Sequence, residues 1–279
     1  MDCPREPCAH LVSSQSKRML HKVKKLLLWL TALGTLVLAI YMMFFLRTGD
    51  ERQLQSTLLN EARTYSIYLP NRYDADVQYP VLYSLDGEKW RHGAIVAANA
   101  SMLAAVGLGP EVIVVAVHAM GQRGRDYRPS HGAEAFVSFL ESELIPEVEQ
   151  AVSTSGKRIL SGHSYGGLFT LYSMTARPNL FDAYFAYDPS ILADEAMLQR
   201  LKVLDRQLEK EPLVLYMNYG FHSNRYEGQY EEILGLLEAQ MKNQVASISS
   251  YYPLPHSLIM LPGQVAGLRY LADHFQHQP

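Results

Sequence analysis

The pentapeptide Gly-His-Ser-Tyr-Gly at 162–166 constrains the fold of this chain more than any other stretch of its 279 residues. An apolar segment, 158–161, precedes it and a helix-forming segment, 167–175, follows it. A serine between two glycines at such a junction is typical of a sharp strand-to-helix turn that holds the serine hydroxyl above a sheet edge. The flanking glycines fit because side chains would clash in so tight a turn. The sequence therefore predicts a strand, a turn and a helix, with Ser164 as candidate nucleophile.

The rest of the chain alternates between strand and helix patterns. Val/Ile-rich 111–117 indicates a strand that is buried on both faces. Such alternation predicts a mostly parallel sheet with helices on both faces. The expected strands are 64–69, 79–85, 111–117, 158–161, 183–187, 213–218 and 246–252, and the expected helices are 94–106, 133–152 with a kink at Pro146, 167–175, 193–204, 230–244 and 267–275.

Ligands of open parallel sheets bind beyond the carboxyl ends of the strands. The residues at those positions are Asp86, Gly87, His118, Ser164, Asp188, the loop 219–227 and His256. Of the ten histidines, His256 follows the last expected strand, where the chain order nucleophile, acid, base places the base. We therefore expect Ser164 and His256 to meet at this edge, with His118 and His222 as other histidines that could line a pocket.

The acid that would orient His256 has three alternatives. Glu227 is the first carboxylate on the loop after Asn218, which is the loop that usually supplies it. A serine–histidine dyad without an acid is the second alternative. Asp188, directly beyond the strand that follows the nucleophile, is the third. The sequence ranks them in that order.

The segment 26–46 contains no charged residue and is long enough to cross the roughly 30 Å core of a bilayer as a helix. Lys22, Lys24 and Lys25 immediately precede it, which predicts a cytoplasmic N-terminus. We expect a basic segment at 1–25, a single-pass anchor in the plasma (inner) membrane at 26–46, a linker at 47–57 and a catalytic domain at 58–279. That domain would be extracytoplasmic, or periplasmic in a double-membrane bacterium. A cleavable signal peptide is the rival interpretation, but its small residues at 32–34 lie inside the apolar run.

Composition excludes several classes of function. The net charge is −3, but it is divided unevenly: residues 1–46 carry six basic and two acidic residues, which leaves 19 basic and 26 acidic residues in the rest of the chain. The main domain is therefore acidic, and nucleic acid is not an expected partner. The two cysteines, Cys3 and Cys8, precede the apolar run, which leaves no disulfide or thiolate chemistry for the main domain. No metal-ligand spacing and no dinucleotide-type glycine loop occurs, so we expect neither a metal nor a cofactor.

Six motifs together resemble the esterase D-like (Putative esterase) family of the α/β-hydrolase superfamily. They lie at 65–70, 79–87, 125–127, 139–146, 162–169 and 252–257. The family includes S-formylglutathione hydrolases, feruloyl and acetylxylan esterases, mycolyltransferases and enterobactin-type siderophore esterases. The resemblance implies the α/β-hydrolase fold, Ser164 as nucleophile and His256 as base. It also implies that the backbone N–H groups of Tyr165 and Glu88 bind the oxyanion.

The chain departs from this family where Ser-Pro-Ser-Leu-Trp is common, because residues 188–192 read Asp-Pro-Ser-Ile-Leu. A dyad without acid occurs in the siderophore branch. The departure bears on the substrate class and on the third catalytic member.

The function expected from these observations is a membrane-anchored serine esterase that cleaves a small-molecule or glycan ester. A siderophore trilactone esterase and an acyltransferase are alternatives within the enzymes. A non-catalytic hydrolase-fold binding module is the alternative outside them. Arg123, Arg125 and Arg128 on the loop after 111–117 could hold an anionic or catecholate substrate, with ion pairs to Asp126 as the competing interpretation. Arg125 and His118 are the predicted substrate contacts, and the oligomeric state stays open.

Overall fold

The computed structural model describes residues 7–45, 48–88, 92–191, 194, 196–204, 213–220, 227–240 and 245–275. The chain divides into two compact units, Met1–Leu46 and Arg47–Pro279. The first unit contains one helix, α1 (Pro7–Phe45), in which Lys22, Lys24 and Lys25 share a continuous helix with the apolar residues that follow. Across the described stretches, no helix combines the length and the apolar character that crossing a membrane requires. The predicted span at 26–46 is therefore not supported.

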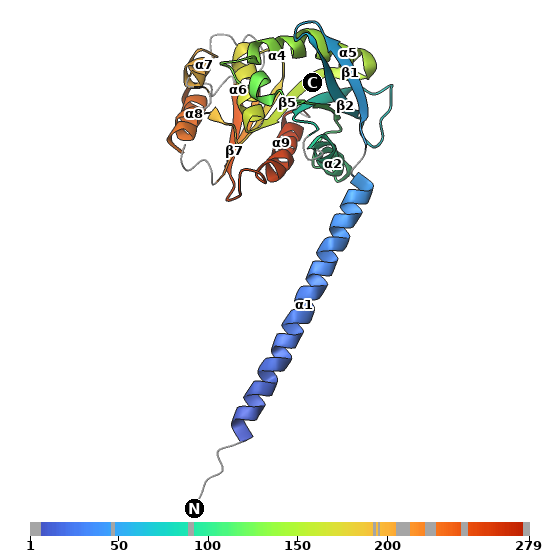
Figure 1. Ribbon diagram of the computed structural model, residues 1–279, viewed down its shortest axis with the longest axis vertical. Helices are drawn as coiled ribbons and strands as arrows, with labels where there is room; N and C mark the ends of the chain where they lie inside the picture. Colours follow the sequence, from blue (N-terminus) through green and yellow to red (C-terminus); the bar gives the residue numbers. More distant parts are fainter. Residues whose placement is uncertain are drawn as a thin grey trace, which may run out of the picture. The chain divides into compact units, whose positions relative to one another are not determined.

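The second unit is built on a mostly parallel sheet, as predicted (Figure 1). Its eight strands, counted over the described residues, lie in the order β1-β2-β4-β3-β5-β6-β7-β8. The pairs β1–β2 and β2–β4 are antiparallel, and all the other neighbouring pairs are parallel. The strands are β1 (Asp50–Ser56), β2 (Glu61–Tyr68), β3 (Tyr79–Leu85), β4 (Ile113–Val117), β5 (Thr154–His163), β6 (Ala183–Tyr187), β7 (Leu213–Tyr219) and β8 (Val245–Tyr251).

Helices cover both faces of this sheet, which confirms the expected layers. α2 (His92–Ala105) and α9 (Met260–Phe275) lie side by side and pack on one face (Figure 1). The other face is covered by α4 (Ala133–Phe139), α5 (Ile145–Ala151), α6 (Tyr165–Ala176), α7 (Met197–Leu204) and α8 (Glu227–Gln240). A short helix, α3 (Arg123–Asp126), follows β4.

β4 shows why a continuous apolar run forms a central strand. Val114 packs with α2 and α9, and Val115 packs in the core under the opposite helices. All five residues of β4 are buried, so each of its valines contributes about 1.5–3 kcal/mol by leaving water. The carboxyl ends of β3, β4, β5, β6, β7 and β8 consequently meet at one edge of a rigid layer.

Two local features differ from the sequence prediction. Most of the predicted linker at 47–57 is an edge strand: β1 pairs with β2 through its backbone, although only Leu54 among its residues is strongly apolar. The predicted kink at Pro146 is a π-helical turn (Leu140–Leu144) that leads into α5, where proline stands in the first turn. Proline lacks the N–H that a regular helix uses, and single π-helical turns inside α-helices are a rare local irregularity.

Candidate active site

Ser164 occupies a strained turn between β5 and α6, as predicted. Its φ of 61° and ψ of −116° lie in a region that a non-glycine residue rarely adopts. The turn is held by its backbone, because the Ser164 N–H donates to Tyr187 O (2.9 Å) and its carbonyl accepts from Leu168 and Ser190. A Cβ on Gly162 would stand 2.3 Å from Gly166 O, so this position requires glycine. The hydroxyl is therefore presented by a rigid backbone.

The hydroxyl of Ser164 has a second serine beside it. Ser164 Oγ lies 3.1 Å from Ser190 Oγ, and either atom can donate. Ser190 belongs to the loop after β6, and its N–H donates to Ser164 O (3.0 Å). The loop beyond β6 is thus fixed against the nucleophile by two contacts.

His256 pairs with Asp188. His256 Nδ1 lies 2.6 Å from Asp188 Oδ2, and the Asp188 side chain is only 4% exposed. An ionised carboxylate only accepts hydrogen bonds, so Nδ1 carries the proton and Nε2 is left as the basic nitrogen. This is the tautomer that a general base next to a serine needs.

The surroundings hold Asp188 in place. Its φ is 41°, and its N–H donates to both Asn218 O (2.9 Å) and Asn218 Oδ1 (3.1 Å). Tyr230, on α8, donates its hydroxyl hydrogen bonds to Pro189 O (2.6 Å) and Asp188 Oδ1 (3.3 Å). The carboxylate is therefore buried and hydrogen-bonded, as a group that orients a histidine should be.

The sequence ranking placed Glu227 above Asp188 as the acid, and the structure gives the contact with His256 to Asp188. Glu227 begins α8, and its side chain lies outside the described residues, as does His222. Glu231 and Glu232 are exposed on α8. The usual acid position, after β7, follows Asn218, whose side chain holds the Asp188 loop instead. Asp188 follows β6, which lies directly between β5 and β7, so the carboxylate comes from the strand next to the one that carries the nucleophile.

The two predicted oxyanion donors lie on the turns that the resemblance implied. Tyr165 is the first residue of α6, so its N–H is among those that a helix leaves without an internal partner. Glu88 follows a turn in which Asp86 has a φ of 58° and Gly87 donates to Val117 O. The Glu88 carboxylate accepts the N–H groups after β4, those of Ala119 and Met120, which fixes its backbone. The binding of an oxyanion by these N–H groups stays a prediction.

Arg123 connects this turn to the nucleophile. Its Nε donates to both carboxylate oxygens of Asp86 (2.8 and 2.9 Å), and its Nη2 donates to His163 O (2.8 Å). Sequence reasoning offered Arg123 only as a substrate contact or a loop ion pair. The structure makes it a tie between the turn after β3 and the residue before Ser164.

The two predicted substrate contacts have partners within the fold. Arg125 pairs with Glu61 and with Asp126, which also binds the buried Arg63. These carboxylates raise the pKa of Arg125. His118 is buried, its Nε2 lies 3.1 Å from Ser66 Oγ, and burial lowers its pKa. Substrate binding by Arg125 and His118 stays a prediction.

His163, inside the pentapeptide, holds the base near the nucleophile. Its Nε2 donates to the backbone carbonyl of His256 (2.7 Å), and the two rings lie 4.4 Å apart between centroids at 38°. Burial, together with the neighbouring His256, lowers the pKa of His163 to about 3. His163 therefore remains neutral while it binds the loop that carries His256.

Two substitutions of His163 distinguish its hydrogen bond to His256 from its effect on stability at low pH. His163→Leu removes the donor and should lower kcat by about 5-fold, since one hydrogen bond contributes about 1 kcal/mol. His163→Gln keeps a donor near the Nε2 position and should retain most of that kcat. The folded pKa of about 3 lies below the unfolded value, so His163 costs stability as pH falls from about 6.5 towards 3.

The Tm of both variants should therefore fall less between pH 7 and pH 4.5 than the Tm of the wild type. Thermal melts at the two pH values measure this, and steady-state kinetics measure kcat. Equal kcat for His163→Leu and the wild type would contradict the positioning role.

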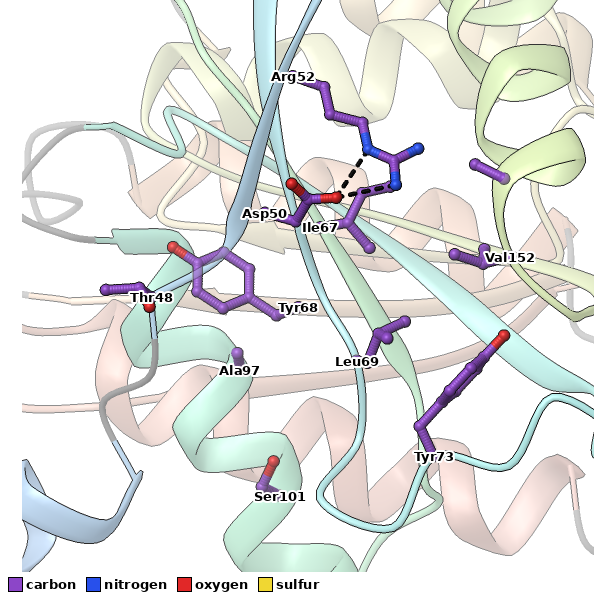
Figure 2. Close-up of a pocket in the computed structure, with 11 residues that line it drawn as sticks. Thr48, Asp50, Arg52, Ile67, Tyr68, Leu69, Tyr73, Ala97, Ser101 and Val152 are labelled. Carbon is purple, nitrogen blue, oxygen red and sulfur yellow. Dashed lines mark hydrogen bonds and ion pairs between the residues drawn. The ribbon is translucent and has the colours of Figure 1, made fainter.

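A cavity lies at the edge of the sheet opposite to the candidate catalytic residues. It encloses about 250 Å³ near the end of β2, which runs antiparallel to its neighbour β4, so it lies away from the carboxyl ends of the parallel strands. Figure 2 shows it with Tyr68, Tyr73 and the Asp50–Arg52 ion pair (2.8 Å) among its lining. None of the candidate catalytic residues lines it. Within the described parts of the chain, no cluster of three metal-binding side chains occurs.

Comparisons with known proteins agree with this geometry. The sequence model of the family described as "Putative esterase" matches residues 56–243. Ferri-bacillibactin esterase BesA of Bacillus subtilis is 33% identical over 172 residues, which cover 51% of this chain and 59% of that protein. Apo-salmochelin esterase of Escherichia coli is 28% identical over 171 residues, which cover 51% of this chain and 52% of that protein.

Among solved structures, an IroE-like serine hydrolase from Shewanella oneidensis superimposes with a TM-score of 0.71 at 28% identity, covering 81% of each chain. The match to the curated relatives spans only somewhat more than half of their length. The family match covers most of this chain, including the strand, turn and helix around Ser164. The chain therefore belongs to the Putative esterase family, with the α/β-hydrolase fold.

Proposed function

We propose that this protein is a carboxylic ester hydrolase in which Ser164, His256 and Asp188 form the catalytic triad. The observation that carries the proposal is the 2.6 Å contact between His256 Nδ1 and the buried Asp188 carboxylate, at the sheet edge where Ser164 stands. The altered segment at 188–192 also fits a non-catalytic binding module. The structure weakens this interpretation, because the aspartate of the segment contacts the histidine that the chain order identifies as base.

The proposed reaction assigns each proton transfer to a named group. Ser164 Oγ attacks the ester carbonyl carbon while His256 Nε2 takes the hydroxyl proton, and Asp188 stabilises the resulting imidazolium. The N–H groups of Tyr165 and Glu88 would receive the oxyanion. Collapse breaks the bond to the alcohol, which takes the proton from His256. Water, activated by the same nitrogen, then releases the acid from Ser164.

The substrate class that fits best is the ester bond of a siderophore. Two of the most similar curated proteins are a ferri-bacillibactin esterase and an apo-salmochelin esterase, and both names state an ester-cleaving activity on such molecules. The proposed substrate class therefore follows the siderophore alternative of the sequence analysis and is narrower than the general serine esterase expected there.

A panel of purified substrates tests this class. A catecholate trilactone should be cleaved with a kcat/KM at least about 10-fold above those of 4-nitrophenyl butyrate and acetylated xylan. Product analysis with an added alcohol acceptor separates hydrolysis from acyl transfer. Cleavage of the glycan ester alone, or acyl transfer in place of hydrolysis, would overturn the siderophore assignment and leave the serine mechanism standing.

We also propose a location for the protein. The basic segment at 1–25 lies on the cytoplasmic side of the membrane, and the catalytic domain lies on the other side. This proposal rests on the uncharged run at 26–46 and on the three lysines before it. An alkaline phosphatase fusion after Arg52 should be active in cells, and an inactive fusion beside an active cytoplasmic reporter at the same point would reverse it.

A further inference from the structure

The loop after β4 carries three arginines, and two of them are neutralised. Arg123 pairs with Asp86, and Arg125 pairs with Glu61 and Asp126. Arg128 differs from both. Within the described ranges it makes no ion pair, and its Nε is buried without a hydrogen-bond partner.

This cation stands beside the aromatic ring of the residue that follows the nucleophile. Arg128 Cζ lies 6.0 Å from the ring centroid of Tyr165, the residue that follows Ser164. Arg123 lies 5.5 Å from the same centroid, so the ring of Tyr165 contacts two guanidinium groups. A cation near an aromatic face gains electrostatic attraction from the ring, which helps to hold Arg128 at this place.

Burying an N–H of a charged group without a hydrogen-bond partner costs free energy. A hydrogen-bond acceptor that binds the same group offsets part of this cost. The guanidinium is planar and matches anions with two acceptor oxygens. Among the described residues no carboxylate forms an ion pair with Arg128; Asp86 is paired with Arg123, and Glu88 accepts the N–H groups of Ala119 and Met120. Because the Nε of Arg128 is shielded from solvent, an anion from outside the fold would bind the terminal nitrogens of the guanidinium.

We propose that Arg128 forms a subsite for an anionic group with two acceptor oxygens, such as a carboxylate, carried by the ester substrate next to its scissile bond. The inference deepens the proposed esterase function and rests on it. The anion can belong either to the acyl part or to the alcohol part of the ester. Arg128 then makes the enzyme prefer anionic esters over neutral esters of the same size.

Two matched pairs of esters distinguish the acyl side from the alcohol side. On the acyl side, 4-nitrophenyl hydrogen succinate is compared with 4-nitrophenyl pentanoate. On the alcohol side, 4-carboxyphenyl butyrate is compared with 4-carbamoylphenyl butyrate. The measured quantity is the ratio of kcat/KM for the anionic ester to that for the neutral ester. Loss of folded protein cancels from this ratio, because both values come from the same preparation.

The wild type should show a ratio of about 10 or more for one of the two pairs, which identifies the side that bears the anion. Arg128→Met should bring that ratio to about one, and Arg128→Lys should give an intermediate ratio because it keeps the charge without the planar fork. Arg52→Met, on the distant edge strand β1, should leave the wild-type ratio unchanged.

A wild-type ratio near one for both pairs, or an unchanged ratio in Arg128→Met, would overturn the subsite. The proposed function fails separately, if no neutral ester is hydrolysed in a way that depends on Ser164.

Discussion

Ser164→Ala is expected to lower kcat/KM for ester hydrolysis by about 10⁴-fold or more, to a rate that oxyanion stabilisation and binding alone can support. The reason is that the reaction has one nucleophile, and Ser164 is the only serine of the strained turn at 162–166. Ser190, whose Oγ lies 3.1 Å away, belongs to the loop after β6 and lacks the helix N-terminus behind it. Steady-state hydrolysis of 4-nitrophenyl butyrate by the purified protein measures the effect.

Two serine variants serve as controls for this experiment. Ser138→Ala, on α4, removes only a hydroxyl that bonds its own helix and should keep wild-type kinetics. Ser190→Ala should cost far less than Ser164→Ala, because it removes a neighbour of the nucleophile. Turnover within about 10-fold of wild type in Ser164→Ala, with an unchanged Tm, would contradict the proposed mechanism.

Asp188→Asn is expected to lower kcat/KM by about 10²- to 10⁴-fold. An amide can donate to His256 Nδ1, which would stabilise the tautomer that carries its proton on Nε2 and cannot act as a base. Glu227→Gln should stay within a few-fold of wild type, because the contact with His256 belongs to Asp188. The measurement is kcat/KM for both variants, with Tm as the check on folding.

The two variants also distinguish the rival interpretations of the acid. A large fall in Glu227→Gln, with little change in Asp188→Asn, would move the acid to the loop after β7. Little change in both would leave a serine–histidine dyad. A large fall of kcat/KM in both variants would show that α8 supports the triad. Tyr230 of this helix already donates a hydrogen bond to Pro189 O, next to Asp188.

The backbone of the fold could be predicted because its signals are local. The apolar run at 113–117 and the pentapeptide at 162–166 each fit one structure only, and the alternation of elements then requires a parallel sheet. β1 escaped prediction because an edge strand exposes polar side chains and is held by backbone pairing with β2, which leaves little trace in its sequence.

The site was less predictable, because its contacts join residues that are far apart in the chain. Ser164 and His256 followed from position and chain order. The choice between Asp188 and Glu227 depends on which loop Asn218 supports, and no spacing in the sequence reveals that. The links Arg123–His163 and His163–His256 span 40 and 93 residues, so only the folded structure shows them as ties between the catalytic loops.

Labelling with a fluorophosphonate tests the central claim most directly, because this reagent reacts readily only with an activated serine. The folded wild-type protein should gain one adduct per chain, located on Ser164 by peptide mass spectrometry. Ser164→Ala should gain none, and Asp188→Asn should be labelled much more slowly than wild type. A folded wild-type protein that takes up no label at Ser164 would contradict the account and favour a binding module with a hydrolase fold.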